Sequence, residues 1–296
     1  MVMDLSVELI HATVQLEQPL GDGTRTVGTG FLINAPTPDG KPRTVLVTAE
    51  HVFERMPGKE ARIGFRIANP DGSWSYSPQP LKIRDEAGAP TWTHHPSRDV
   101  AVMSITAPDA FAKAAIPLNW LASDKTFVDN DITAGDEMMA LGFPRGLSAN
   151  QAGFPILRAG RVASYPVAPA DIFPTFLLDF AVFPGNSGGP VFVSRHERQA
   201  AAASDAATDA AAAPTRTSTA PATVAPPQGE FIAGLLTQQV ELNKERLGIG
   251  IVTHAKFIRE AIARLDDPNA PIATVRAEPP MNGGKTASAE EAADAQ

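Results

Sequence analysis

Short runs of β-branched and aromatic residues, separated by glycine, proline, asparagine and aspartate, dominate the hydrophobic pattern of this chain. Such runs favour strands, and the breaks between them favour turns. The runs predicted to be strands are Val27–Ile33, Thr44–Thr48, Ile63–Ile67, Val100–Thr106, Glu137–Leu141, Ile156–Ser164, Phe176–Phe180, Val191–Val193, Phe231–Gln239 and Gly248–Val252. Together with 23 glycines and 27 prolines, they indicate an all-β fold of antiparallel sandwiches or barrels rather than alternating strand–helix units.

The pattern changes near the C-terminus and in two polar stretches. Thr253 is a candidate helix cap, and it precedes apolar residues that share one helical face: Phe257, Ile258, Ala261, Ile262 and Leu265. We therefore expect one helix packed on the strands. Residues 196–229 are rich in alanine, proline, threonine and serine, and residues 276–296 are mostly small or polar. Both stretches lack large apolar side chains, so we predict a disordered insertion and a disordered tail.

Composition narrows the classes of function. The chain has 296 residues, 43% of them hydrophobic, and a formal net charge of −8. The acidic balance argues against a nucleic-acid-binding protein, which would need a basic surface. The absence of cysteine excludes disulfides, thiolate metal sites and a cysteine nucleophile. The pair His94–His95 lacks the spacing of a zinc motif, so we expect no metal and no cofactor.

Hydropathy gives no sign of a membrane protein. Acidic residues and a histidine interrupt the first twenty residues, which lack a basic region followed by an apolar core. No later segment approaches the run of about 18 apolar residues that a membrane-spanning helix needs. We expect no membrane span. The missing export signal favours the cytoplasm, whereas an incomplete N-terminus would favour the periplasm.

The segment Pro184–Pro190 reads Pro-Gly-Asn-Ser-Gly-Gly-Pro between two apolar strands. Its glycines permit positive φ angles and close backbone approach, so that successive N–H groups can point to one place. A serine hydroxyl beside such donors is suited to acyl transfer, because the N–H groups hold the oxyanion that forms. Taken alone, the segment would also suit a tight turn. Ser187 is therefore a candidate nucleophile.

Two upstream residues complete the candidate chemistry. His51 follows the predicted strand Thr44–Thr48, and an imidazole can take the serine proton near neutral pH and return it. Asp99 directly precedes another apolar strand, where its carboxylate could accept a hydrogen bond from Nδ1 of His51 and fix the tautomer. Either residue alone is more often structural. The order His, Asp, Ser favours a catalytic triad.

These motifs resemble those of the chymotrypsin-like serine peptidases, and among them the bacterial HtrA/DegP-type protease domain. The matching segments occur in the family's order: Gly28–Ile33, Val47–Val52, Asp99–Met103, Met139–Gly146, Gly160–Val162, Gly185–Pro190 and Gly248–Ile251. The resemblance implies two six-stranded antiparallel β-barrels with the active-site cleft between them. It places His51 and Asp99 in an N-terminal barrel, residues 1–125, and Ser187 in a C-terminal barrel with the helix, residues 126–275.

The resemblance also implies further site residues. The backbone N–H groups of Gly185 and Ser187 would be the oxyanion donors. Ala181, six residues before the serine, would lie at the floor of the pocket for the P1 side chain, with Val182, Thr237 and Gln239 around it. A pocket without a carboxylate predicts a small or aliphatic P1 residue rather than lysine or arginine.

The sequence therefore predicts a serine endopeptidase that acts on polypeptides through an acyl-enzyme. Two alternatives stay open: a catalytically silent peptide-binding module of the same fold, and an esterase that uses the same triad. The chain departs from the HtrA pattern because no PDZ domain follows, and because the alanine- and proline-rich insertion comes directly after the nucleophile strand. These departures leave the regulation and the oligomeric state unpredicted.

Overall fold

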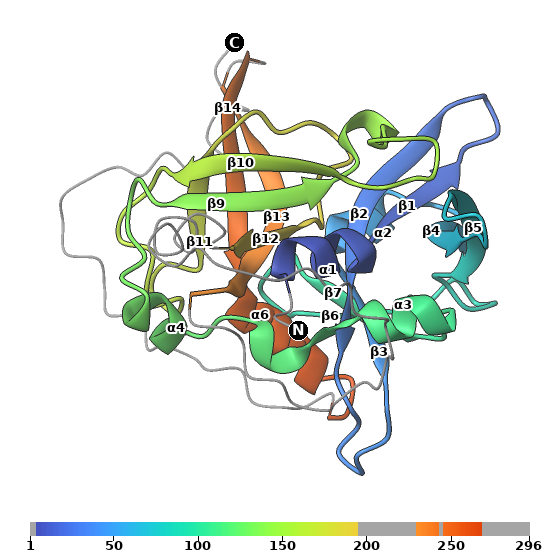
Figure 1. Cartoon of the computed structure of the whole chain (residues 1–296), viewed down its shortest axis with the longest axis horizontal. Coiled ribbons are helices and arrows are strands. Elements are labelled where there is room, and N and C mark those ends of the chain that lie inside the picture. Colours follow the sequence, from blue (N-terminus) through green and yellow to red (C-terminus); the bar gives the residue numbers. More distant parts are fainter. Residues whose placement is uncertain (1–3, 195–228, 243–244, 268–296) are drawn as a thin grey trace, which may run out of the picture.

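The structure is a computed structural model that describes residues 4–194, 229–242 and 245–267. Two β-sheets account for most of it, and every predicted strand run overlaps an observed strand (Figure 1). The strands are β1 (Thr13–Pro19), β2 (Arg25–Asn34), β3 (Thr44–Thr48), β4 (Glu60–Ala68), β5 (Trp74–Lys82), β6 (Thr93–His94), β7 (Ala101–Ile105), β8 (Ile116–Pro117), β9 (Glu137–Gly142), β10 (Ile156–Val162), β11 (Thr175–Asp179), β12 (Pro190–Val193), β13 (Phe231–Leu242) and β14 (Glu245–His254). The helices are α1 (Leu5–Ala12), α2 (Glu50–Glu54), α3 (Asp109–Ala114), α4 (Asp124–Asp129) and α6 (Ala255–Ala263), with 3-10 turns η1 (Leu118–Trp120) and η2 (Pro144–Gly146).

The C-terminal half forms the predicted six-stranded barrel. Its strands close in the order β10-β11-β14-β13-β12-β9, and all the neighbouring pairs are antiparallel. The strand that follows the serine motif, β12, is buried along its whole length. The loop that carries Ser187 is therefore anchored by a buried strand.

The N-terminal half does not form the predicted closed barrel. Its strands follow the order β5-β4-β1-β2-β3-β7-β6, with β8 paired to β2, and the two ends of this path, β5 and β6, are not joined. Pro78 and Pro80 lie in β5 opposite Gly64 and Arg62 of β4. Proline has no N–H. In an edge strand, the side of a proline where the N–H would be faces away from the neighbouring strand. The edge of β5 that would close the barrel is therefore short of donors.

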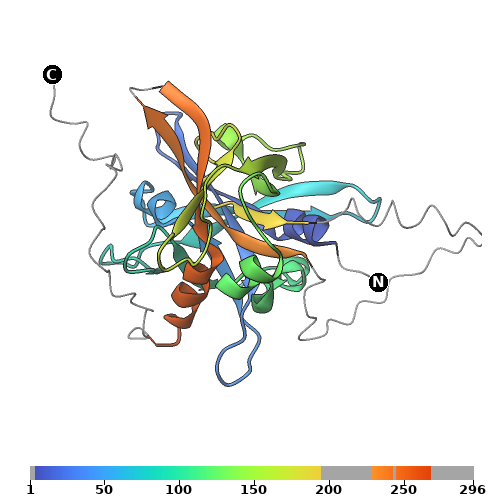
Figure 2. The ribbon, with the colours of Figure 1, turned by 90° about the vertical axis from the view of Figure 1, so that its left-hand side faces the viewer.

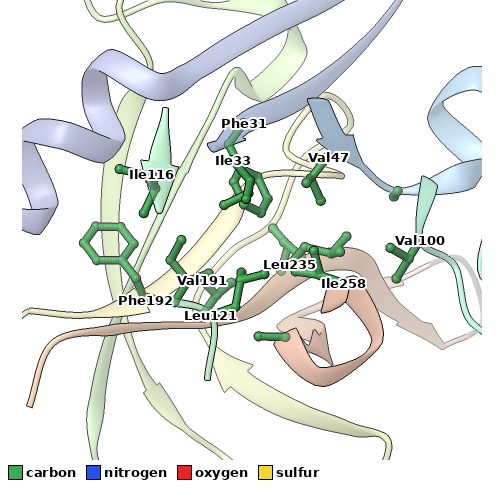
Figure 3. Close-up of a cluster of buried hydrophobic side chains, with 14 of the residues drawn as sticks. Phe31, Ile33, Val47, Val100, Ile116, Leu121, Val191, Phe192, Leu235 and Ile258 are labelled. Atoms are coloured by element: carbon green, nitrogen blue, oxygen red, sulfur yellow. The ribbon is translucent and has the colours of Figure 1, made fainter. Parts of the chain in front are cut away.

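The two halves share one hydrophobic core (Figure 3). Phe31 and Val47 of the first sheet face Val191 and Leu235 of the C-terminal barrel (Figure 3). Ile258 of α6 closes the cluster from below (Figure 3). Each of these side chains is fully buried. Burial of one such side chain is worth about 1.5–3 kcal/mol, so the shared core fixes how the two halves face one another.

Two helices differ from expectation. The N-terminal helix α1 was not predicted; the Asp4 carboxylate caps it by accepting the N–H groups of Ser6 and Val7, and Leu5 and Leu9 are buried beneath it. In α6 the predicted apolar face is buried, but the cap is not Thr253, which still belongs to β14. The N-cap position is His254, whose side chain makes no capping hydrogen bond.

Helix α6 follows the second barrel along the chain but is tied to the first half (Figure 2). Nε2 of the buried His95 lies 2.9 Å from the Glu260 carboxylate. Arg43, next to β3, donates two hydrogen bonds of 2.6 and 3.0 Å to the carboxylate of Asp266, just beyond the helix. Because His95 lies in the loop that leads to Asp99, its contact with Glu260 holds that loop against the second half.

Several expectations concern residues that the structure does not describe. The predicted insertion 196–229, apart from Gly229, and the predicted tail 276–296 lie outside the described residues. Within the described part of the chain, none of the helices combines the length and the apolar character that a bilayer crossing requires.

Candidate active site

His51 and Asp99 are joined by two hydrogen bonds. Strand β3 ends at Thr48, and His51 lies in the first turn of α2, while Asp99 lies in the loop before β7. Nδ1 of His51 is 2.6 Å from Oδ2 of Asp99, and the backbone N–H of His51 donates to Oδ1 at 3.0 Å. The carboxylate thus fixes both the ring and the backbone of the histidine. A ring held through Nδ1 leaves Nε2 as the atom that can accept a proton.

A second carboxylate lies next to the histidine. Partial burial raises the pKa of Glu50 above its ordinary value, against the opposing pull of His94. Nδ1 of His94 lies 3.0 Å from Oε1 of Glu50. We did not predict either residue as part of the site, although the direct adjacency of Glu50 to His51 was a visible signal. The Glu50 carboxyl group is thus a second acid directly adjacent to His51 in the chain, and it is paired to His94.

The loop that carries Ser187 packs against both halves of the molecule without space for side chains at two glycines. A Cβ atom on Gly188, where φ is +87°, would overlap the Thr29 carbonyl oxygen and the Thr48 hydroxyl. One on Gly189 would overlap the Leu141 carbonyl oxygen. The two glycines after Ser187 are therefore required by close backbone approach, and by positive φ at the first of them.

The Ser187 hydroxyl donates to the backbone carbonyl of Thr237 in β13, at 3.0 Å. A hydroxyl has one proton to donate, so in this rotamer it is not given to His51. The structure thus brings His51 and Asp99 into contact, and it leaves Ser187 bonded to a strand of the second barrel. Rotation about χ1 of the serine is the change that would redirect the hydroxyl.

The predicted oxyanion donors have no intramolecular hydrogen-bond partner in the part of the chain that the structure describes. Among the described residues, the backbone N–H groups of Gly185 and Ser187 have no hydrogen-bond partner, whereas that of Asn186 donates to Phe183 and that of Gly188 to Leu236. Gly185 has φ of +97°, a conformation that favours glycine. Two unpartnered N–H groups, two positions apart in the chain, are the kind of donors that an oxyanion requires.

The four predicted pocket residues differ in how far they are buried. Val182 and Thr237 are buried, Ala181 is exposed, and the side chain of Gln239 lies outside the described set. Gly250 of β14 was not predicted: a Cβ there would lie 2.9 Å from Cγ2 of Val182 and 3.0 Å from Cδ1 of Leu236. A glycine inside a predicted strand signals such a close approach.

Comparisons with known proteins agree with this architecture. A family model described as a trypsin-like peptidase domain matches residues 28–200. A solved structure of a variant of the HtrA-type protease AlgW with a tripeptide has a TM-score of 0.50 and 15% sequence identity, covering 89% of this chain and 63% of that one. A solved structure of AlgW itself with a tripeptide has a TM-score of 0.49 and 16% sequence identity, and the match covers 88% of this chain and 62% of that one. No curated protein shows a significant match. The chain spans less than two thirds of the length of these two structures. At 15% sequence identity, the similarity to the AlgW variant shows the fold alone.

Proposed function

Because the chain belongs to the trypsin-like peptidase family, we propose that it is a serine endopeptidase in which Ser187 is the nucleophile, His51 the general base and Asp99 the orienting carboxylate. The observation that carries this assignment is the pair of hydrogen bonds between His51 and Asp99 in the same molecule as a glycine-walled Ser187 loop with two unpartnered N–H groups. Polypeptides would be the substrates.

In the proposed reaction, the Ser187 hydroxyl leaves the Thr237 carbonyl and turns to Nε2 of His51. Exchanging one neutral hydrogen bond for another costs at most about 0.5–1.5 kcal/mol. The hydroxyl oxygen attacks the peptide carbonyl as its proton passes to His51, and the N–H groups of Gly185 and Ser187 hold the oxyanion. His51 then gives the proton to the leaving amine, and water hydrolyses the acyl-enzyme by the same steps.

We further propose that the P1 pocket accepts a small or aliphatic side chain. Val182, Leu236 and Phe180 are buried apolar side chains that lie within 3.4 Å of the place where a Cβ on Gly250 would stand. An apolar lining favours an apolar side chain, since a cationic one would be buried there without a partner. A peptide-library cleavage profile tests this preference, and cleavage mainly after lysine or arginine would contradict it.

The test of the proposed function is cleavage of casein by the wild type and by Ser187→Ala. We expect turnover by the wild type and none by the variant. The bond from Ser187 to Thr237 favours one rival, a catalytically silent module that binds extended peptides. That rival predicts equal peptide binding by both proteins and turnover by neither. An esterase would hydrolyse an ester substrate but not the matching amide.

A further inference from the structure

Thr29 is a fully buried residue of β2 that connects the two halves of the molecule. Its backbone N–H donates to the carbonyl of Ser187 at 2.9 Å. Its hydroxyl donates to the carbonyl of Gly185 at 2.6 Å and accepts the backbone N–H of Phe143 at 3.1 Å. Thr29 belongs to the first sheet, and all three of these partners belong to the second half. One side chain therefore bonds two segments of the second half from across the interface.

Two carbonyl groups hold the peptide planes on either side of Gly185. The Gly185 carbonyl belongs to the peptide that follows this residue, and the Pro184 carbonyl, in the peptide that carries the Gly185 N–H, accepts the backbone N–H of Arg145 at 2.6 Å. The N–H of Gly185 lies in the same planar trans peptide as the Pro184 carbonyl, so it points in the opposite direction. Holding both carbonyls fixes the peptide planes on either side of Gly185. The N–H is then preorganised before any substrate binds.

The surroundings of Thr29 leave its hydroxyl one arrangement. The Thr48 hydroxyl donates to the Thr29 carbonyl at 2.7 Å, which holds the strand in place. A Cβ on Gly142 would lie 3.2 Å from the Thr29 Oγ1, so this glycine leaves the space that the side chain fills. With one acceptor and one donor on opposite sides, the hydroxyl proton is directed to Gly185.

We propose that Thr29 is a positioning residue for the oxyanion hole: its hydroxyl ties the Gly185 carbonyl to the first sheet and so couples packing of the two halves to the direction of the Gly185 N–H. The inference rests on the proposed function. Thr29 does not touch substrate in this account. It acts through Gly185 alone, so its loss weakens transition-state stabilisation and leaves substrate binding unchanged.

The test uses three substitutions in the full chain and one matched control. Thr29→Val keeps the shape and removes the hydroxyl, Thr29→Cys keeps a weaker donor, and Thr29→Ser keeps the hydroxyl. Thr13→Val is the control, because Thr13 is also buried in this sheet but its hydroxyl has no partner among the described residues. All are measured with an N-acyl-valine ester after circular dichroism has confirmed folding.

We expect kcat of Thr29→Val to fall at least about tenfold, up to the roughly 10²–10³-fold that loss of a whole oxyanion donor costs. KM should change less than about threefold, because only transition-state binding is lost. Thr29→Cys should be intermediate, and Thr29→Ser and Thr13→Val should stay close to the wild type. If Thr29→Val does not fold, the comparison of Thr29→Cys with Thr29→Ser carries the test.

A second readout separates the oxyanion hole from general damage. The matching thionoester, whose carbonyl oxygen is replaced by sulfur, gains less from N–H donors placed for oxygen. We expect Thr29→Val to lower the rate for the ester more than for the thionoester, so that the ratio of the two rates falls at least about tenfold. Equal slowing of both substrates, or unchanged ester kinetics in Thr29→Val, would overturn the proposal.

An inactive wild type would contradict the proposed function and would still leave Thr29 testable. The Gly185 amide signal in a ¹H–¹⁵N spectrum reports the peptide's orientation without turnover. We expect that signal to shift or split in Thr29→Val and to stay in place in Thr13→Val. An unmoved Gly185 signal in Thr29→Val would refute the positioning role, whether or not the wild type is active.

Discussion

Asp99→Asn is the substitution whose effect follows most directly from the geometry of the site. The Asp99 carboxylate accepts two hydrogen bonds, from the backbone N–H of His51 at 3.0 Å and from its ring Nδ1 at 2.6 Å. An asparagine can keep the first bond with its oxygen, and its NH₂ group then faces Nδ1. Because that group is a donor, Nδ1 becomes an acceptor and the ring proton moves to Nε2. A protonated Nε2 cannot take the proton of Ser187.

The magnitude follows from this change of tautomer. The equivalent change in a Ser-His-Asp triad lowers kcat about 10⁴-fold, which corresponds to about 5 kcal/mol of activation free energy. The assay is hydrolysis of a peptide p-nitroanilide with an aliphatic P1 residue. Asp179→Asn is the matched control, because Asp179 is an exposed carboxylate of β11, and it should retain wild-type activity. If Asp99→Asn keeps more than about a tenth of wild-type kcat, the assignment of Asp99 is wrong.

Two further predictions concern the pocket and the core. Gly250→Ala places a methyl group 2.9 Å from Cγ2 of Val182. The value of kcat/KM for a substrate with valine at P1 should therefore fall by about 10–200-fold relative to one with alanine at P1. Unchanged selectivity between the two substrates would show that Gly250 does not line the pocket. Burial lowers the pKa of His254 from 6.5 to about 4. Below pH 6.5 the unfolded chain binds a proton that the native chain excludes, so the free energy of unfolding should fall by about 2 kcal/mol between pH 7 and pH 5. Urea unfolding should show this loss in the wild type and a smaller one in His254→Gln; equal losses would contradict the account.

The strands, and the motifs around His51, Asp99 and Ser187, were predictable because their signals are local. Runs of consecutive apolar residues mark β2, β3 and β7, and the glycines around Ser187 occur where a side chain would overlap the neighbouring backbone. Helix α1 also has a local signal, the Asp4 cap followed by apolar residues at helical spacing, which the acidic and polar residues of the segment obscured. The unpredicted strand β5 carries serine, glutamine and proline in place of an apolar alternation.

The remaining features depend on contacts between distant parts of the chain. In the open first sheet, Pro78 and Pro80 of β5 lie opposite Gly64 and Arg62 of β4, and this register is known only from the structure. The acceptor of the Ser187 hydroxyl lies 50 residues further along the chain, on β13. Thr29 and Gly185 are 156 residues apart. No local pattern reports such pairings, so the sequence predicts the chemical groups and the structure supplies their orientation.

The central claim is that Ser187 is an activated nucleophile, and covalent labelling tests it most directly. The wild type is treated with a fluorophosphonate, digested, and mapped by mass spectrometry. The account predicts one phosphonylated residue, Ser187, and loss of the adduct in both Ser187→Ala and Asp99→Asn. Equal labelling of the wild type and Ser187→Ala, or an adduct mapped to another residue, would contradict it.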